Sequence, residues 1–266
     1  MKIVGKVLLT LLAVLILGIV GILGLLGYIP GLSSLLGADK PRDLGITYTQ
    51  EDYTSARAKS QLVYEELPAE TPVALSIQHS GSRTVGTSWD SAEMTSLLND
   101  RPYRFWPIFD VQLRIHNDGT AELSGIVIKE KLKGYAMGIG VPEQATKTIV
   151  NLLPSEAPFY VKAKTSLVEN KVGDFDIQAV SLGRMPIPVN TLLAKLANLT
   201  RQIVKPVFAE NIVTELSKYE GKRAAIINFI NERLGKITGF YAKKAYFSDG
   251  KLYFDGTLSE KEITVR

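Results

Sequence analysis

The first thirty residues of this chain constrain its structure more than any other segment. After Lys2 and Lys6, an unbroken apolar run extends from Val7 to Ile29, and no further charge occurs before Asp39. At about 1.5 Å per helical residue, such a run spans the roughly 30 Å hydrocarbon core of a bilayer. We therefore expect a transmembrane anchor at residues 1–32.

This run is longer than the apolar core of a secretory signal peptide, which usually holds about 7 to 15 residues. Gly37-Ala38 is also a poor cleavage site. An uncleaved signal-anchor is therefore favoured, with a cleaved signal and a soluble core helix as the alternatives. Because Lys2 and Lys6 precede the run, we expect the N-terminus in the cytoplasm and the C-terminal domain outside it, at the cell membrane. The predicted anchor residues are Val7, Leu11, Leu15, Ile19, Ile22, Leu26 and the interfacial Tyr28.

The rest of the chain has a nearly balanced charge. The full sequence holds 31 basic and 27 acidic residues, and without Lys2 and Lys6 the count is 29 against 27. A nucleic-acid-binding protein needs concentrated positive charge, so we expect no nucleic-acid partner. The chain has no cysteine, which excludes disulfides and a lipid-modified cysteine anchor.

Two segments follow the predicted anchor. Residues 33–71 are weakly patterned and suit a spacer with one short helix, Tyr53–Tyr64, capped by Thr49 or Thr54. Residues 72–266 are expected to form one extracytoplasmic α+β domain, in which helices cover one face of an antiparallel sheet.

Alternating apolar residues predict the strands of that domain. Phe109–His116 alternates strictly, and Asn117-Asp118-Gly119 supplies the residues of a tight hairpin turn before a return strand at residues 120–129. Further strands are expected at residues 73–79, 159–168, 175–182, 237–247 and 251–257, the last two around Ser248-Asp249-Gly250.

Helical periodicity occurs in the same domain. Ser88 is expected to cap a short helix that ends near Asn99, and Pro142 to begin another. After Pro188 the apolar period changes from two to about 3.6. It predicts one helix up to Pro206, a second that stops at Gly221, and a third over residues 223–234.

No catalytic motif is present, so we expect no enzyme, cofactor or metal site. The sequence lacks the zinc-protease, nucleophile-elbow, phosphate-loop and dinucleotide patterns. Ser248 and Lys251 match Ser-x-x-Lys, but on a hairpin turn and not at the helix start that this chemistry needs. Asp174 and Asp176 could share one face of a strand and bind a cation through their carboxylate oxygens, but a solvated surface is the commoner explanation.

Four stretches carry a resemblance to a known family. Residues 89–99, 109–125, 180–188 and 247–258 resemble bacterial membrane-anchored extracytoplasmic proteins of the YpmS type. The resemblance extends distantly to tubular lipid-binding domains, and it implies a curved antiparallel sheet that wraps a long helix and encloses an apolar groove. Pro206 and Gly221 interrupt the long helix that this family pattern implies.

Two functions remain open from the sequence. The first is a single-pass, membrane-anchored extracytoplasmic protein that binds a lipid or other apolar ligand near the membrane. The second is a tethered structural or protein-interaction module of the cell envelope with a fully packed core and no ligand. The candidate residues for an apolar-ligand groove are Leu192, Leu196, Ile203, Phe208, Ile212, Phe175 and Ile177.

Overall fold

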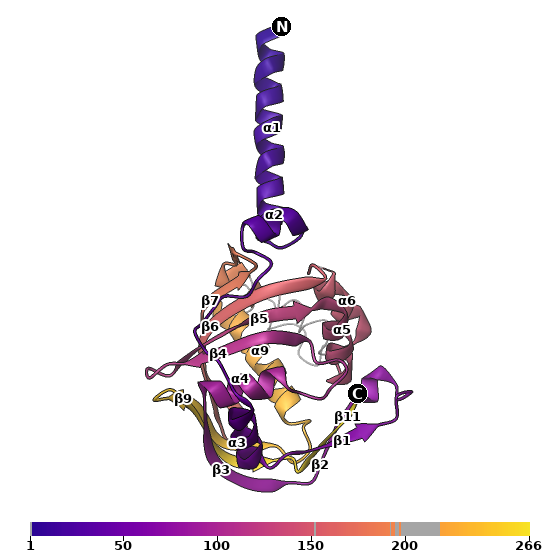
Figure 1. The fold of residues 1–266 in the computed structure, drawn as a ribbon, viewed down its shortest axis with the longest axis vertical. Helices are drawn as coiled ribbons and strands as arrows, with labels where there is room; N and C mark the ends of the chain where they lie inside the picture. The colour runs from indigo at the N-terminus through magenta and orange to yellow at the C-terminus, as the bar shows by residue number, and fades with distance from the viewer. Residues whose placement is uncertain (1, 152, 192, 195–196, 198–218) are drawn as a thin grey trace.

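A helix at the N-terminus projects from a folded body that contains most of the chain (Figure 1). The computed structural model describes the backbone of residues 2–151, 153–191, 193–194, 197 and 219–266, and their side chains from Val14 onward except at 148–149 and 219–220. Helix α1 (Lys2–Leu25) is followed by the short α2 (Pro30–Leu35) at its base. Among the described residues, no helix is long and apolar enough to cross a membrane.

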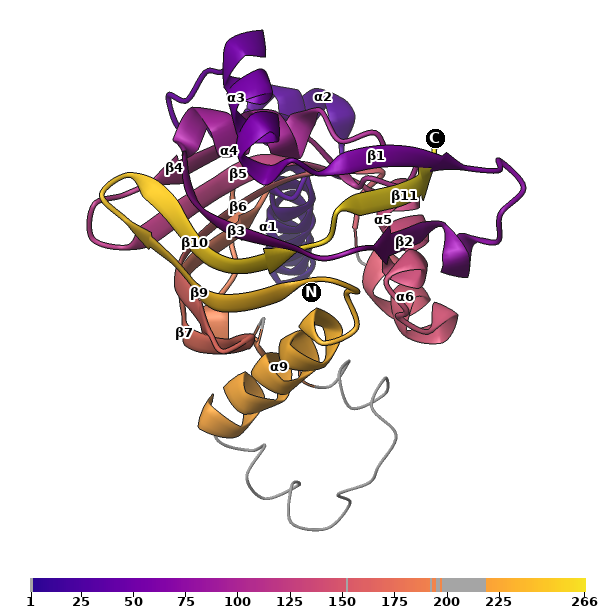
Figure 2. The ribbon, with the colours of Figure 1, turned by 90° about the horizontal axis from the view of Figure 1, so that it is seen from below.

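The described body is built on an antiparallel sheet of eight strands that curls into a half-barrel (Figures 1 and 2). The principal order is β3-β10-β9-β6-β5-β4, and β7 and β8 extend the sheet from β6. The bounds are β3 Arg83–Asp90, β4 Ile108–Ile115, β5 Thr120–Ile128, β6 Glu156–Val168, β7 Lys171–Leu182, β8 Met185–Pro186, β9 Tyr241–Ser248 and β10 Lys251–Leu258. The predicted α+β class with a curved antiparallel sheet is confirmed by this arrangement.

A smaller sheet joins the two ends of the domain. Within the described residues it has the order β1-β11-β2, with β1 at Val63–Leu67, β2 at Ile77–Ser80 and β11 at Lys261–Val265. Strands β1 and β11 pair in parallel, from Val63 opposite Lys261 to Leu67 opposite Val265. The strand expected at residues 73–79 is partly wrong, because its first residues form the 3-10 helix η1 (Val73–Leu75).

Helices cover one face of the large sheet and surround its open side. Their bounds are α3 Gln50–Ser60, α4 Ser91–Asn99, α5 Lys129–Gly138, α6 Glu143–Val150 and α9 Tyr219–Leu234. Trp89 and Phe254 lie in the core under α3, with ring centroids 6.3 Å apart. Burial of such aromatic side chains supplies much of the stabilisation of a small core.

Local sequence signals explain most element ends. Thr49 caps α3 through a capping box: its hydroxyl accepts a hydrogen bond from the Asp52 amide, and the Asp52 carboxylate accepts one from the Thr49 amide. The cap predicted for α4 is wrong: Ser88 pairs with Tyr253 in the sheet, and Asp90 caps the helix through Glu93. The stop predicted at Gly221 is also wrong, because α9 runs through that residue.

A buried ion pair ties β11 to the loop after α4. The Glu262 side chain is 3% exposed, and Arg101 Nε donates to its Oε1 at 2.9 Å while Nη2 contacts Oε2. His79 Nε2 lies 3.5 Å from the same carboxylate. Burial would raise the pKa of Glu262, but the hydrogen bond with His79 and the Arg101 charge outweigh burial and hold the pKa below its ordinary value.

Replacing Glu262 by Gln is expected to lower the free energy of unfolding by about 3 kcal/mol near neutral pH, because Arg101 is left without its charge partner. The folded-state pKa of Glu262 is lowered, so its contribution is present above the unfolded pKa and is lost as pH falls through the folded pKa. The difference between wild type and E262Q should therefore shrink towards acid pH. Urea denaturation of the detergent-solubilised chain at several pH values measures this difference in the free energy of unfolding.

Glu65→Gln is the matched control in the same small sheet. Its partner Lys261 lies 2.6 Å away, and both side chains are more than two-fifths exposed. Such a surface pair contributes only about 0–1 kcal/mol. An equal loss of stability in E65Q and E262Q would contradict the role given to Glu262.

Candidate functional site

Two of the seven predicted groove residues can be placed. Leu192, Leu196, Ile203, Phe208 and Ile212 lie outside the described residues. Phe175 and Ile177 lie on β7 and are half-buried. The structure therefore brings these two together on one strand and leaves the rest of the groove a prediction.

Phe175 and Ile177 form part of an apolar row on the inner face of the sheet. Phe175 pairs with Thr165 and Ile177 with Ala163, and a register shift after Lys162 then places Val180 opposite Val161. Val161 in turn pairs with Leu123, which packs into the core beneath α4. The row thus faces the side of the sheet that the helices occupy.

Helix α9 lies along the outer edge of β7 and partners its backbone. Arg223 Nε donates to the Phe175 carbonyl at 2.8 Å, and the Val172 amide donates to Asn231 Oδ1 at 2.8 Å. An unpaired strand edge is prone to association with other strands. The side chains of Arg223 and Asn231 bond to the β7 backbone where a further strand would otherwise pair, so the apolar row ends against α9.

The end of α1 is docked on the turn between β7 and β8. The Arg184 amide donates to the Leu25 carbonyl at 2.9 Å, and Arg184 Nε donates to the Gly37 carbonyl at 2.8 Å. Gly183 has φ +56°, and a Cβ there would lie 2.3 Å from Leu25 O. A glycine is needed at this position because both the conformation and the close approach exclude a side chain.

Residues 39–49, which belong to the predicted spacer, cross the outer face of the sheet. The Arg42 amide donates to Ser124 Oγ at 2.7 Å, and its Nη2 donates to Ser181 Oγ at 3.1 Å. The Arg42 guanidinium also lies 4.0 Å from the centre of the Tyr160 ring. Farther along, Gln112 Oε1 accepts from the amides of Leu44 and Ile46 at 2.7 and 3.2 Å. This strap reaches from β7 to β4.

A polar cluster centred on Glu122 lies beside the strap. Tyr160 Oη donates to Glu122 Oε2 at 2.8 Å, His116 Nε2 lies 2.7 Å from Oε1, and Lys162 Nζ lies 3.7 Å from the same oxygen. Burial and the hydrogen bond to Glu122 raise the pKa of Tyr160 to about 12. Burial would raise the pKa of Glu122 too, but the hydrogen bonds with Tyr160 and His116 hold it below its usual value. The cluster keeps the Glu122 carboxylate charged and partnered on the outer face of the sheet.

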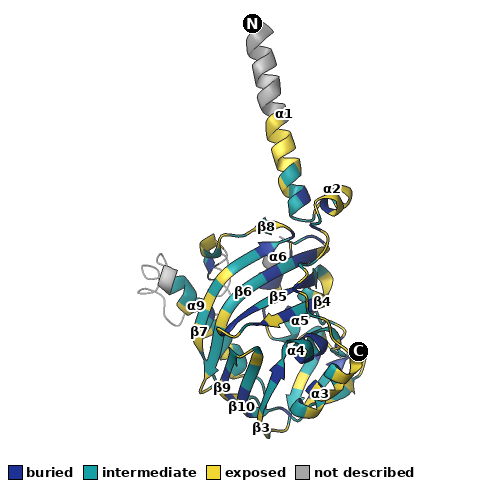
Figure 3. Ribbon diagram, turned by 60° about the vertical axis from the view of Figure 1, so that its left-hand side comes forward, coloured by how far each residue is buried: buried dark blue, intermediate teal, exposed yellow. Residues whose placement is uncertain are grey.

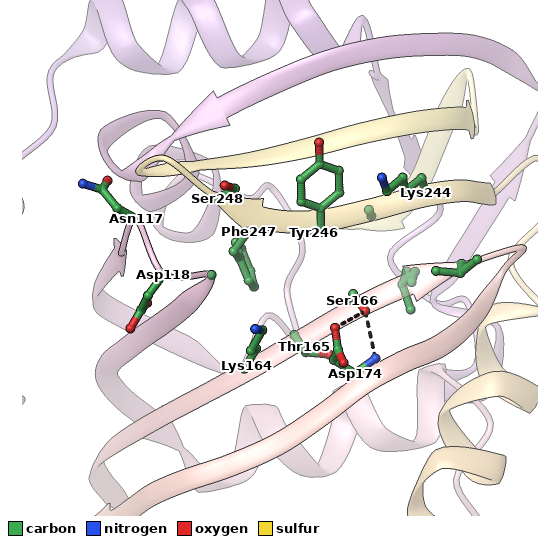
Figure 4. A pocket seen from close by; sticks show the side chains of 14 residues that line it. Asn117, Asp118, Lys164, Thr165, Ser166, Asp174, Lys244, Tyr246, Phe247 and Ser248 are labelled. Atoms are coloured by element: carbon green, nitrogen blue, oxygen red, sulfur yellow. Dashed lines mark hydrogen bonds between the residues drawn. The ribbon is translucent and has the colours of Figure 1, made fainter.

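A hollow of about 420 Å³ opens where β5 separates from β6 and β9 takes its place (Figure 4). Ser166 Oγ accepts from the Asp174 amide at 2.8 Å and lies 3.1 Å from the Asp174 carboxylate. A second hollow shares Lys244 and Tyr246 with the first and is also lined by Tyr253. The rings of Tyr246 and Tyr253 are stacked, with their centroids 5.3 Å apart. Neither of these two hollows includes a predicted groove residue.

No metal site is assembled in the described part of the chain. There, no three His, Cys, Asp or Glu side chains lie close enough to hold a metal ion. Asp174 and Asp176 are both exposed on β7, and Asp176 accepts from Gln178 at 3.3 Å. Ser248 lies at the end of β9 beside the predicted turn and contacts Asp249 at 2.9 Å.

Comparison of the chain with known protein families, curated proteins and solved structures gives no match. The resemblance to the YpmS type therefore stays a prediction.

The residues that connect α1 and the strap to the sheet, Arg42 and Arg184, were not predicted from the sequence. Neither Arg42 nor Arg184 belongs to a binding motif that the sequence shows, and each acts through contacts with segments about 80 or more residues away. Glu122 and Lys162 occupy polar positions in the expected strands at residues 120–129 and 159–168, and their opposite charges are the signal that could have paired them across the sheet.

Gly183→Ala is expected to separate the sheet from the end of α1, because the new methyl group would meet the Leu25 carbonyl. The Arg184 amide should then lose protection from hydrogen exchange by about tenfold or more. Exchange measured by mass spectrometry on the full chain in detergent micelles reports this amide.

Gly250→Ala is the matched control. Gly250 also has a positive φ, +74°, but its Cβ would meet nothing closer than 3.8 Å. This variant carries the conformational cost without the collision. Equal loss of protection at Arg184 in both variants would show that the docking contact does not depend on Gly183.

Proposed function

We propose that this chain is a single-pass membrane protein whose C-terminal domain lies outside the cytoplasm and binds a lipid or other apolar ligand beside the bilayer. One observation carries the membrane part of this proposal: the apolar side chains of α1 from Val14 to Ile22 are exposed. Leu15 is 60% exposed, Leu17 70%, and Ile19 and Ile22 each 49%. Figure 3 shows this exposed stretch above the body. A surface of this kind is unfavourable in water and favourable in lipid.

The apolar run of the sequence supports the same proposal. Val7 and Leu11 lie in the part of α1 whose side chains are not described, but they continue the run without a charge. Lys2 and Lys6 on the short side favour a cytoplasmic N-terminus.

The ligand part of the proposal rests on the inner face of β6 and β7. Phe175, Ile177 and Val180 are half-buried in a row on a curled sheet, and α9 closes one side of that row. A concave sheet that meets helices along an apolar row is a common setting for an apolar ligand. The Val180 end of the row lies four residues before Arg184, which bonds to the end of α1, and a bound acyl chain would enter the row from this membrane-facing end.

A topology experiment tests the anchor. The full chain, tagged at either end, is expressed in bacterial cells, which are converted to spheroplasts and treated with protease. We expect the C-terminal tag to be digested from outside while the N-terminal tag is protected. Recovery of the chain in the soluble fraction, with both tags protected, would overturn the anchor.

A photo-crosslinking experiment tests the ligand. The full chain is placed in nanodiscs that contain a phospholipid with a photoreactive acyl chain, and the adducts are mapped by mass spectrometry. We expect adducts on β6 and β7 as well as on α1. Ile177→Asn should remove the strand adducts and leave those on α1, because a polar amide disrupts only the inner row.

Asp176→Asn is the control on the same strand, since Asp176 is exposed and faces away from the row. It should leave the strand adducts unchanged. Adducts confined to α1 and α2 in the wild type would contradict ligand binding and favour the tethered interaction module with a packed core.

A further inference from the structure

We propose that α2 and the last turn of α1 form a hairpin that lies in the interfacial layer of the bilayer and holds the β7–β8 end of the sheet against the membrane surface. This inference rests on the proposed membrane anchor. It adds a second membrane contact and a defined orientation of the domain. The partner is a lipid bilayer.

The first argument is that α2 packs against α1 inside the predicted span. Leu32 and Leu36 contact Gly24, where a Cβ would lie 2.6 Å from Leu32 Cδ2 and 3.3 Å from Leu36 Cδ1. Gly24 lies five residues before the end of the apolar run at Ile29. Because α2 contacts this position side by side, it must lie at the same depth as the last turn of α1 (Figure 1).

The second argument concerns the backbone at the end of α1. The last carbonyls of a helix need partners, and few water molecules are available close to the hydrocarbon. Each of the last four carbonyls of α1 accepts a hydrogen bond. The donors are the amides of Leu26 to Ile22 (3.0 Å), Tyr28 to Leu23 (2.9 Å), Gly27 to Gly24 (3.2 Å) and Arg184 to Leu25 (2.9 Å). Ser33 Oγ donates a further bond to Gly24 O at 2.8 Å and is buried.

The turn between the helices has the geometry of a Schellman motif, with Gly27 at φ +92°. The Tyr28 amide reaches back to Leu23 and the Gly27 amide to Gly24. Gly37, at φ +64°, ends α2 in the same manner. The hairpin therefore satisfies its own backbone and can enter an environment poor in water.

The third argument is the outward face of α2. Leu35 is 82% exposed, the highest value among the exposed large apolar side chains of the described residues. The segment from Pro30 to Ala38 carries no charge. An interfacial helix buries its apolar face about 5–10 Å into the boundary between headgroups and acyl chains. Leu35 continues the exposed apolar surface of α1 into that layer.

The domain is held directly on this hairpin. Arg184 bonds to Leu25 at the end of α1 and to Gly37 at the end of α2, so one residue of the β7–β8 turn ties both helices to the sheet. The strap through Arg42 then continues along the outer face. With α1 across the bilayer, this connection places the β7–β8 end next to the lipid and directs the small sheet away from it.

Site-directed fluorescence on the full chain tests the hairpin. The natural sequence has no cysteine, so Leu35→Cys gives a single labelling site for an environment-sensitive fluorophore. The labelled protein is placed in nanodiscs of phosphatidylcholine and phosphatidylglycerol, with or without a lipid that carries a nitroxide quencher near its headgroup. We expect the label at position 35 to emit at shorter wavelength and to be quenched several-fold more strongly than the control.

Leu75→Cys is the matched control. Leu75 is also an exposed leucine, at 55%, but it lies in η1 beside the small sheet. Neither side chain supports the core, so neither label should disturb the fold. Position 75 should keep the emission of a label in water and show little quenching.

The outcomes separate this inference from the anchor. If the protein elutes with the nanodiscs but position 35 is quenched no more than position 75, the interfacial hairpin is overturned and the anchor stands. If the protein does not enter the nanodiscs, the anchor is overturned and this inference with it. Strong quenching at position 35 alone supports both.

Discussion

Strand β6 pairs along both of its edges, and the arrangement of the body depends on this double pairing. One edge pairs with β7, while the other pairs with β5 up to Lys164 and then with β9 from Ser166 to Val168. Neighbouring strands are twisted relative to one another, and the sheet curls where β9 follows β5 along this edge of β6. The curl brings the β9–β10 hairpin under the helices and creates the inner face on which Phe175 and Ile177 lie. It also produces the hollow beside Ser166 and Asp174.

The junction between α1 and the body follows from a different constraint, the need of every backbone carbonyl for a donor. Helix α1 ends with four carbonyls that have no partner within the helix. The turn at Gly27, the hydroxyl of Ser33 and the amide of Arg184 supply the donors. The same hydrogen bonds therefore complete the helix and dock it on the sheet. This is the physical basis for proposing that the domain has a defined position at the membrane and is not suspended on a free spacer.

Short-range features of this chain were predictable, and long-range ones were not. The Asn117–Gly119 and Asp249-Gly250 turns are correct because residues that tolerate positive φ sit between alternating strands. The cap of α4 was misplaced because Ser88 satisfies the local capping rule equally well, yet cross-strand pairing with Tyr253 holds it in β3. The parallel pairing of β1 with β11 joins segments about 200 residues apart, for which no local pattern exists.

The candidate site divides in the same way. The sequence by itself determined that the chain begins with a long apolar run, that its domain is α+β, and that Phe175 and Ile177 alternate with polar neighbours on one strand. These properties depend on period and on φ preference, which neighbouring residues encode. Only the tertiary structure decided that Glu262 meets Arg101, that Arg42 contacts three strands, and that Gly183 and Arg184 meet the end of α1. Those contacts join segments far apart in the sequence, and no local pattern encodes which distant segments become neighbours.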